Sequence, residues 1–275
     1  MKILEERIKL PNITLNVAAA GDLYGKPILL LHGCPDAWFA WEKVMKGLVK
    51  YGFRVIAPDQ RGYNLSDKPN GIKPYHTENL VQDAIDLMTY FGYDKFDLAG
   101  HDYGAYVAWI TALEFPNRVN KLLIMGGLHP TILQNIKDLS WKQWIKSWYI
   151  LFFRMKRLPE WVIRRNNFQF FHYNHSVTLD AKSRERYAAA WSQPNSIESM
   201  INWYRVPPVK IENPFLEMSV LMIWGEKDLY LTTEAADACL KFCPKGKLII
   251  IKNASHWLML EETNRVVEEM IAFFE

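Results

Sequence analysis

The chain has 275 residues, of which 49% are hydrophobic, and its formal net charge at pH 7 is +3. This length suits one large α/β domain with an insertion or two small domains, and the apolar content excludes a disordered chain. The small charge, with no long basic run, argues against a nucleic-acid partner.

The cysteines and the N-terminal residues bear on the compartment. Cys34, Cys239 and Cys243 lack the spacing of a metal site, so we expect reduced thiols, no metal and a cytoplasmic protein. The first residues, Met1-Lys-Ile-Leu-Glu-Glu-Arg7, are charged where a signal peptide needs an apolar segment. No apolar run is long enough to cross a bilayer, so no transmembrane segment is expected.

The first half of the chain alternates predicted strands and helices. Two strands are expected at Ile3–Leu10 and Ile13–Ala20. Further strands, seen as short apolar runs, and helices, seen as apolar residues at helical spacing, then alternate. The strands are expected at Ile28–Leu31, Arg54–Ala57, the residues before Gly100, and Lys121–Met125, and the helices after Trp38, near Glu78–Phe91 and after Asp102. This order indicates a mainly parallel sheet covered on both faces.

The alternation stops between about residues 129 and 213, where aromatic and basic segments with helical spacing replace the strands. One of these segments is Arg154–Arg165. The alternation resumes with a strand at Val220–Trp224, a helix near Thr233–Phe242, a strand at Lys247–Lys252 and a closing helix at Arg265–Phe274. We interpret residues 129–213 as a helical cap inserted into a core made of residues 1–128 and 214–275.

The stretch Gly100-His-Asp-Tyr-Gly104 follows an apolar run and precedes a helical pattern. This pattern is typical of a nucleophile elbow, the tight strand-to-helix turn that exposes one side chain above a parallel sheet. The usual serine is replaced by Asp102. A carboxylate is already anionic, and it gains little by attacking an acyl carbonyl. Attack on an epoxide carbon, or on a carbon that bears a halide, gives a stable alkyl ester on the enzyme.

Hydrolysis of that ester requires a general base and a group that orients it. In proteins built around a nucleophile elbow, the catalytic residues follow one another along the chain in the order nucleophile, acid, histidine. The acid and the histidine lie in loops after late strands. Asp228 and His256 fit that order, with Glu226 as a nearby competitor for the acid. The stretch after the sixth strand, Gly126-Gly127-Leu128, has no carboxylate, which favours Asp228. The backbone N–H groups of Cys34 and Tyr103 would form the oxyanion hole.

Several motifs along the chain together resemble those of epoxide hydrolases in the α/β-hydrolase superfamily. They are His32-Gly33-Cys34-Pro35, the run Asp59–Pro69, Gly100–Gly104, Gly127-Leu-His-Pro130, Trp224-Gly-x-x-Asp228 and Ser255-His256. The resemblance extends nearly end to end. It implies an α/β-hydrolase fold, with a mainly parallel eight-stranded sheet and an inserted helical cap. It also implies a reaction without a cofactor, in which a lipophilic epoxide and water give a vicinal diol.

The same resemblance implies further site residues in and around the cap. Tyr149 and Tyr204 stand in segments similar to those holding the two cap tyrosines that bind the epoxide oxygen. Candidate substrate contacts are Pro35, Trp38, His129 and Trp257. We expect His101 to be a buried structural residue, His172 and His175 to lie on the cap surface, and the basic run at Arg154–Arg157 to be a solvated helix face.

Two other functions stay open at this stage. The first is a haloalkane or haloacid dehalogenase using the same Asp102, His256 and Asp228. Tyr103 and Cys34 replace residues that would hold the departing halide, which counts against it. The second is a non-catalytic ligand-binding protein, although both nucleophile and base are present. Substrate identity, oligomeric state and peripheral membrane association are not determined by the sequence.

Overall fold

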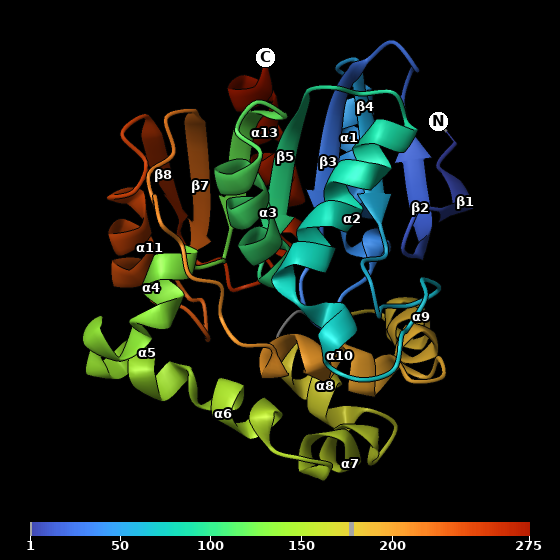
Figure 1. The fold of residues 1–275 in the computed structure, drawn as a ribbon, viewed down its shortest axis with the longest axis vertical. Coiled ribbons are helices and arrows are strands. Elements are labelled where there is room, and N and C mark those ends of the chain that lie inside the picture. The colour runs from blue at the N-terminus through green and yellow to red at the C-terminus, as the bar shows by residue number, and fades with distance from the viewer. Residues whose placement is uncertain (1, 176–178) are drawn as a thin grey trace.

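The computed structural model, which describes residues 2–175 and 179–275, has a central sheet with helices on both faces and a helical region beyond one end (Figure 1). The sheet has eight strands in the order β1-β2-β4-β3-β5-β6-β7-β8. β2 is antiparallel to β1 and β4, and all other neighbours are parallel. The strands are β1 (Leu4–Lys9), β2 (Thr14–Ala20), β3 (Lys26–Leu31), β4 (Phe53–Pro58), β5 (Phe96–His101), β6 (Val119–Met125), β7 (Ser219–Gly225) and β8 (Gly246–Ile251). The predicted α/β fold with a mainly parallel eight-stranded sheet is confirmed.

Helices on both faces bury the sheet. Figure 1 shows α2 and α3 in front of the sheet and α1 and α13 behind it. Because both faces are covered, the central strands are buried at nearly every position rather than alternating between buried and exposed residues. The core helices are α1 (Glu42–Val49), α2 (Thr77–Tyr90), α3 (Tyr103–Glu114), α11 (Thr233–Leu240), α12 (Leu258–Glu261) and α13 (Thr263–Phe274).

A run of helices between β6 and β7 lies beyond the carboxyl ends of the parallel strands (Figure 1). These helices are α4 (Pro130–Gln134), α5 (Trp141–Lys146), α6 (Trp148–Arg154), α7 (Leu158–Arg164), α8 (Gln169–Asn174), α9 (Ala181–Trp191) and α10 (Ser196–Arg205). The predicted single helical segment Arg154–Arg165 is wrong, since Arg157 has a left-handed φ of 64° and separates α6 from α7. Within residues 2–175 and 179–275, no helix is long and apolar enough to cross a membrane.

Strand register brings several loops to one edge of the sheet. Leu31 at the end of β3 pairs with Gly100 on β5, and Gly225 at the end of β7 pairs with Ile251 on β8. Parallel strands in register end at the same edge. The loops that follow β3, β5, β7 and β8 therefore meet beneath the helical insertion.

The turn after β5 is tight because α3 packs directly on the end of β3. A Cβ atom on Gly104 would lie 2.3 Å from the carbonyl oxygen of Leu31, a contact that no side chain tolerates. Nine of the twelve residues of α3 are buried, so the helix cannot move away to make room. Glycine at this position is therefore a packing requirement of the turn.

Candidate active site

Asp102 occupies the turn between β5 and α3 in a strained backbone conformation. Its φ and ψ are 51° and −119°, a region that non-glycine residues rarely adopt. Its backbone N–H donates to the carbonyl of Met125 on the neighbouring strand at 3.1 Å, and its carbonyl accepts from Tyr106 at 3.1 Å. These bonds hold the turn while the carboxylate projects above the sheet edge.

His256 lies between two carboxylates in the loop after β8. Its Nδ1 is 2.7 Å from Asp228 Oδ2, and its Nε2 is 3.4 Å from Asp102 Oδ2. The other oxygen of Asp228 accepts from the backbone N–H groups of Tyr230 at 2.7 Å and Leu231 at 2.9 Å. The imidazole ring is thus oriented by a carboxylate that is itself fixed by the backbone.

A glycine leaves room for this imidazole. A Cβ atom on Gly126 would lie 3.1 Å from His256 Nδ1 and 3.5 Å from Asp228 Oδ2, and the φ of Gly126 is +50°. A carboxylate side chain after β6 would therefore collide with the pair. The space beside His256 that an acid at Gly126 would need is thus already occupied by the imidazole and by Asp228.

Burial and charge act in opposite directions on these groups. Burial alone lowers the pKa of His256, but the Asp228 and Asp102 carboxylates raise it to about 10. Burial raises the pKa of Asp102, yet the hydrogen bond and charge of His256 outweigh it and leave the pKa below its usual value. In the free enzyme Asp102 is therefore anionic and His256 is protonated.

Two backbone N–H groups lie close to Asp102. One belongs to Cys34, and the other belongs to Tyr103, the next residue in the chain. The N–H of Cys34 donates to Asp102 Oδ1 at 2.9 Å. The N–H of Tyr103 is the first of α3 and has no acceptor within the helix. Burial raises the pKa of the Cys34 thiol, so that side chain stays neutral. The sequence prediction brought these two positions together, and the structure places both beside Asp102.

Two tyrosines from the helical insertion face the same space as Asp102. Tyr149 on α6 and Tyr204 on α10 have ring centroids 6.1 Å apart with the rings nearly perpendicular. Burial raises the pKa of both phenols well above the usual value, and the nearby Asp102 charge adds to this effect. Both hydroxyls therefore remain protonated and able to donate hydrogen bonds at any physiological pH.

Two cavities meet at these three side chains. The larger, of about 550 Å³, and the smaller, of about 300 Å³, are both lined by Asp102, Tyr149 and Tyr204. Leu128, Ile136 and other apolar residues line the larger one. The reactive carboxylate therefore stands between two mostly apolar chambers, and the pair of cavities suits a lipophilic small molecule.

The four predicted substrate contacts divide into two pairs. Pro35 and Trp257 line the smaller cavity beside His256. Trp38 and His129 line neither cavity. The indole of Trp38 donates to Glu5 at 3.0 Å, and the His129 ring is buried in a stack on Phe242 at 4.4 Å. We therefore correct the roles of Trp38 and His129 to structural ones, since packing turns both rings away from the site.

The sequence did not predict the role of Asp36, a buried carboxylate that joins the core to the insertion. Asp36 Oδ1 lies 2.9 Å from His175 Nε2 and accepts from the hydroxyl of Tyr187 at 2.9 Å. Its Oδ2 accepts from the indole of Trp257 at 3.1 Å. Burial raises the pKa of Asp36, but the neighbouring rings of His101 and His175 more than reverse this and leave the carboxyl ionised. The one available signal was an acidic residue directly after the His32–Pro35 motif.

Two histidines, His175 and His101, lie close to Asp36. The prediction that His175 lies on the cap surface is wrong, because it is fully buried against Asp36. His101 is fully buried, and its Nε2 lies 3.0 Å from the carbonyl oxygen of His256. His101 thus supports the loop that carries His256. Among the described residues, no group of His, Cys, Asp or Glu is arranged to hold a metal ion.

The chain is similar to known proteins both in sequence and in structure. Residues 26–263 match the family model described as alpha/beta hydrolase fold. The chain is 39% identical over 267 residues to AB hydrolase superfamily protein YfhM of Bacillus subtilis, covering 94% of this chain and 93% of that protein. It is 31% identical over 282 residues to epoxide hydrolase 4 of Homo sapiens, covering 98% of this chain and 77% of that protein.

Solved structures give the same picture. An epoxide hydrolase mutant from Bacillus megaterium, complexed with its product (R)-3-[1]naphthyloxy-propane-1,2-diol, superimposes with a TM-score of 0.90 at 26% identity, over 98% of this chain and 99% of that one. An epoxide hydrolase from metagenomes of hot environments superimposes with a TM-score of 0.89 at 25% identity, over 100% and 99% of the two chains. The likeness covers the sheet and the helical insertion alike.

Proposed function

The chain belongs to the α/β-hydrolase fold family and within it to the epoxide hydrolases, and from that premise we propose that it works through an ester on Asp102. In this proposal a lipophilic epoxide and water become a vicinal diol in two chemical steps. The diol that the Bacillus megaterium protein holds as its product is of this type. In this proposal the helices within residues 129–213 act as the cap over the site, and residues 1–128 and 214–275 form the core.

Ring opening is the first step. The N–H of Cys34 engages Asp102 Oδ1, which leaves Oδ2 as the attacking oxygen. Oδ2 forms a bond to one ring carbon while the bond from that carbon to the epoxide oxygen breaks. The ring oxygen becomes an alkoxide, a poor leaving group unless acids meet the charge as it develops. The phenols of Tyr149 and Tyr204 donate hydrogen bonds to that oxygen, and one of them transfers a proton.

Ester hydrolysis is the second step. Oδ1 becomes the carbonyl oxygen of the ester, already in contact with the Cys34 N–H. His256 Nε2 takes a proton from a water, whose oxygen attacks Cγ of Asp102. The N–H groups of Cys34 and Tyr103 stabilise the oxyanion. Collapse breaks the ester bond and the leaving oxygen takes the proton from His256. The proton left on the Asp102 carboxyl returns to the phenolate, and the diol departs.

The charge state of His256 couples the two steps. Two carboxylates hold the pKa of His256 at about 10 in the free enzyme, so the imidazole is charged. The ester removes the charge of Asp102, which lowers the pKa of His256, so the imidazole releases its proton to water and can then act as a base. His256 therefore becomes a base only after the ester that it helps to hydrolyse has formed.

The observation that carries this proposal is the position of two protonated phenols and one carboxylate on the lining of the same two cavities. The test is the variant His256→Gln incubated with styrene oxide. We expect the protein mass to increase by the mass of the epoxide and the adduct to map to Asp102. A variant that keeps turning over, or an adduct on another residue, would contradict the assignment of these two groups.

The dehalogenase remains the second candidate because it would use the same Asp102, His256 and Asp228. The structure disfavours it at one point: the Tyr103 hydroxyl donates to the carbonyl of Trp203 at 2.7 Å and does not face a halide. A panel of epoxides and haloalkanes distinguishes the two. We expect diol from the epoxides and no halide release, and halide release without diol would reverse the order.

We also retain the proposal of a cytoplasmic location. Cys239 and Cys243 are buried free thiols, a form that a reducing compartment preserves. Localisation of the tagged protein by fractionation tests it. Recovery in an oxidising compartment would contradict it.

A further inference from the structure

The helices α5, α6 and α7 expose several large apolar side chains that lie close together in the chain. Trp141 is 70% exposed, Leu151 63% and Trp161 56%. We call the exposed apolar surface of these three helices the outer face; it consists of Trp141, Trp144, Trp148, Leu151, Leu158 and Trp161. Contiguous exposed apolar side chains of this size mark an interaction site rather than a solvated surface.

The spacing of these residues places them on one side. Trp141, Trp144, Trp148 and Leu151 recur every three or four positions along α5 and α6, which follow one another almost without a break. The opposite side of α5 carries Gln143, which is fully buried and accepts from the N–H of Thr232 at 2.8 Å. The amphipathic pattern is therefore reversed, with a polar residue inward and the tryptophans outward.

Basic residues surround the outer face. Residues 136–165 contain eight Lys or Arg and two Asp or Glu, a net charge of +6 in a chain whose total is +3. One of the two acids, Glu160, is buried and paired with Arg205 at 2.7 Å, so it does not offset the surface charge. Arg165 stacks on the ring of Trp161 at 4.5 Å.

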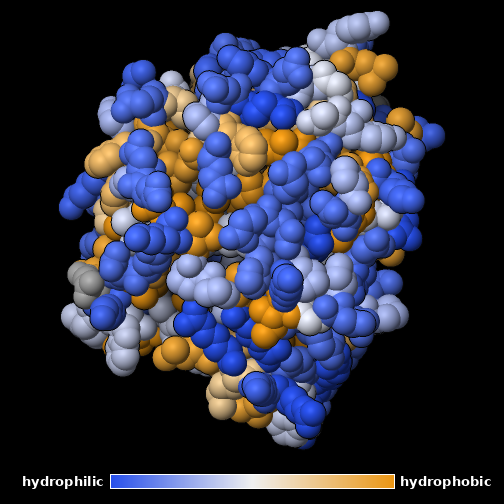
Figure 2. All heavy atoms as spheres, viewed as in Figure 1, coloured by the Kyte–Doolittle hydropathy of each residue, from blue (hydrophilic) through white to orange (hydrophobic). Residues whose placement is uncertain are grey.

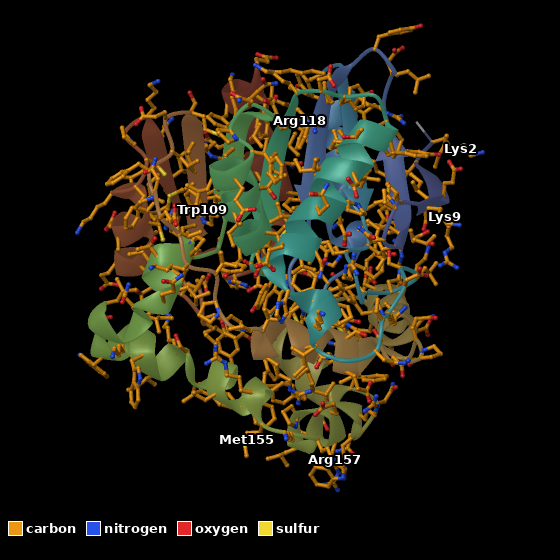
Figure 3. All side chains as sticks on the ribbon, viewed as in Figure 1. Lys2, Lys9, Trp109, Arg118, Met155 and Arg157 are labelled. Atoms are coloured by element: carbon orange, nitrogen blue, oxygen red, sulfur yellow. The ribbon has the colours of Figure 1, made fainter. Side chains whose placement is uncertain are left out.

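The figures show where this surface lies. In Figure 3, Met155 and Arg157 are at the end of the molecule remote from the sheet, whereas Lys2 and Lys9 lie along one edge of the sheet. Figure 2 shows orange, apolar side chains among blue ones at that lower end, where Figure 1 places α6 and α7. The turn between α6 and α7, which joins two of the helices of the outer face, therefore lies at the end of the molecule remote from the sheet.

Both cavities reach the outer face. Trp144, Trp148 and Leu151 belong to the lining of the larger cavity, and Trp148 also lines the smaller one. These side chains are more than half exposed, so they form the rim between each cavity and the exterior. The route into the site therefore opens within the apolar, basic surface.

We propose that the outer face docks the protein on an anionic lipid surface. Tryptophan and leucine are the side chains that enter the headgroup region, and lysine and arginine beside them attract anionic lipids. A lipophilic epoxide dissolved in the bilayer then enters the cavities without crossing water. This last point rests on the proposed function, whereas the docking itself rests on the surface alone.

Charge favours a lipid surface over a second copy of this chain. A two-fold dimer through the outer face would set one +6 segment against another. An anionic bilayer neutralises the same charges. The partner that matches both the apolar and the basic residues is therefore negatively charged and fluid enough to admit tryptophan.

The test is sedimentation with vesicles of equal parts phosphatidylserine and phosphatidylcholine, compared with phosphatidylcholine alone. We expect the wild-type protein to bind the first, with binding that weakens as salt rises. The triple variant Lys142→Gln, Lys156→Gln and Arg157→Gln should bind about 100-fold more weakly, because each basic residue near an anionic surface contributes roughly a factor of five. The variant Trp141→Ser with Trp161→Ser should lose binding to the phosphatidylserine vesicles at least about tenfold.

The matched control removes the same charge elsewhere. Lys2→Gln, Lys9→Gln and Lys50→Gln should leave binding within about twofold, since Lys2 and Lys9 lie along one edge of the sheet and Lys50 follows the core helix α1. Three results would overturn the proposal: wild-type protein that stays in solution, equal loss in control and test variants, or a wild-type dimer by light scattering that the tryptophan variant converts to a monomer.

Activity on styrene oxide in vesicle-free buffer separates this proposal from the catalytic one. Trp141, Lys142, Lys156, Arg157 and Trp161 line neither cavity, so each variant should keep the wild-type rate. An inactive wild-type protein that still binds vesicles would count against the proposed function alone. An active protein that ignores vesicles would count against docking alone.

Discussion

The sheet edge and the helical insertion contribute to one site by different physical means. Asp102 and Asp228 are positioned by backbone hydrogen bonds at strand ends, with donors at 2.7 to 3.1 Å. Tyr204, by contrast, is positioned by ring packing, on Phe153 at 4.7 Å and on Tyr103 at 4.8 Å. Backbone bonds fix a side chain within tight limits, whereas aromatic packing permits several arrangements of similar energy.

This difference indicates a division of roles. The sheet edge supplies the nucleophile and the base, whose geometry must not vary between the two chemical steps. The insertion supplies the groups that meet the epoxide oxygen and enclose the substrate, and its position depends on contacts such as those of Asp36 with His175 and Tyr187. Substitutions in the two regions should therefore differ in how strongly they change the reaction rate and the stability of the fold.

The largest expected effect comes from the sheet edge. Asp102→Ala removes the attacking oxygen, so the rate of diol formation should fall by about 10⁴-fold or more. The circular dichroism spectrum should be unchanged, because the turn is held by backbone bonds rather than by the carboxylate. A variant that retains a tenth of the activity would show that water attacks the epoxide directly.

The next effect lies at the junction between the two regions. Asp36→Ala leaves His175 and Tyr187 buried without their shared acceptor, so the free energy of unfolding should fall by about 3–5 kcal/mol. Urea titration measures it. Asp237→Ala, at an exposed position on α11, is the control and should change stability by less than about 0.5 kcal/mol. Equal losses in the two variants would contradict the role given to Asp36.

Within the insertion, Tyr204→Phe and Tyr149→Phe should each lower kcat by about 10²-fold to 10³-fold. Each variant removes a hydroxyl and keeps the ring packing, so stability should hardly change. Tyr173→Phe, at an 85% exposed position, is the control and should be fully active. Full activity in both test variants would remove the phenols from the mechanism and favour the dehalogenase.

The last expected effect concerns the dependence of stability on pH. The pKa of His256 is 6.5 in the unfolded chain and about 10 in the folded one, so folding favours the charged ring. That contribution is complete below pH 6.5 and is lost as pH rises through about 10. We expect stability to fall across this interval in wild type and to stay level in His256→Gln. Asp102→Ala removes one of the two carboxylates, so its decline should end at a lower pH.

The sheet and the sheet-edge residues followed from the sequence because their signals are local. Buried strands appear as short apolar runs, and Gly104 and Asp102 are adjacent in sequence to the turn that requires them. Asp36 could not be predicted, because its partners lie 139 and 151 residues away. The same holds for Trp38 and His129, whose motif positions suggested pocket contacts while tertiary packing turned them elsewhere.

The most direct measurement of the central claim is a single turnover in water enriched in heavy oxygen, with enzyme in excess over epoxide. We expect the heavy atom in the carboxylate of Asp102, because water attacks its Cγ and the diol takes its new oxygen from the protein. Heavy oxygen found in the diol, with none in Asp102, would contradict the ester mechanism.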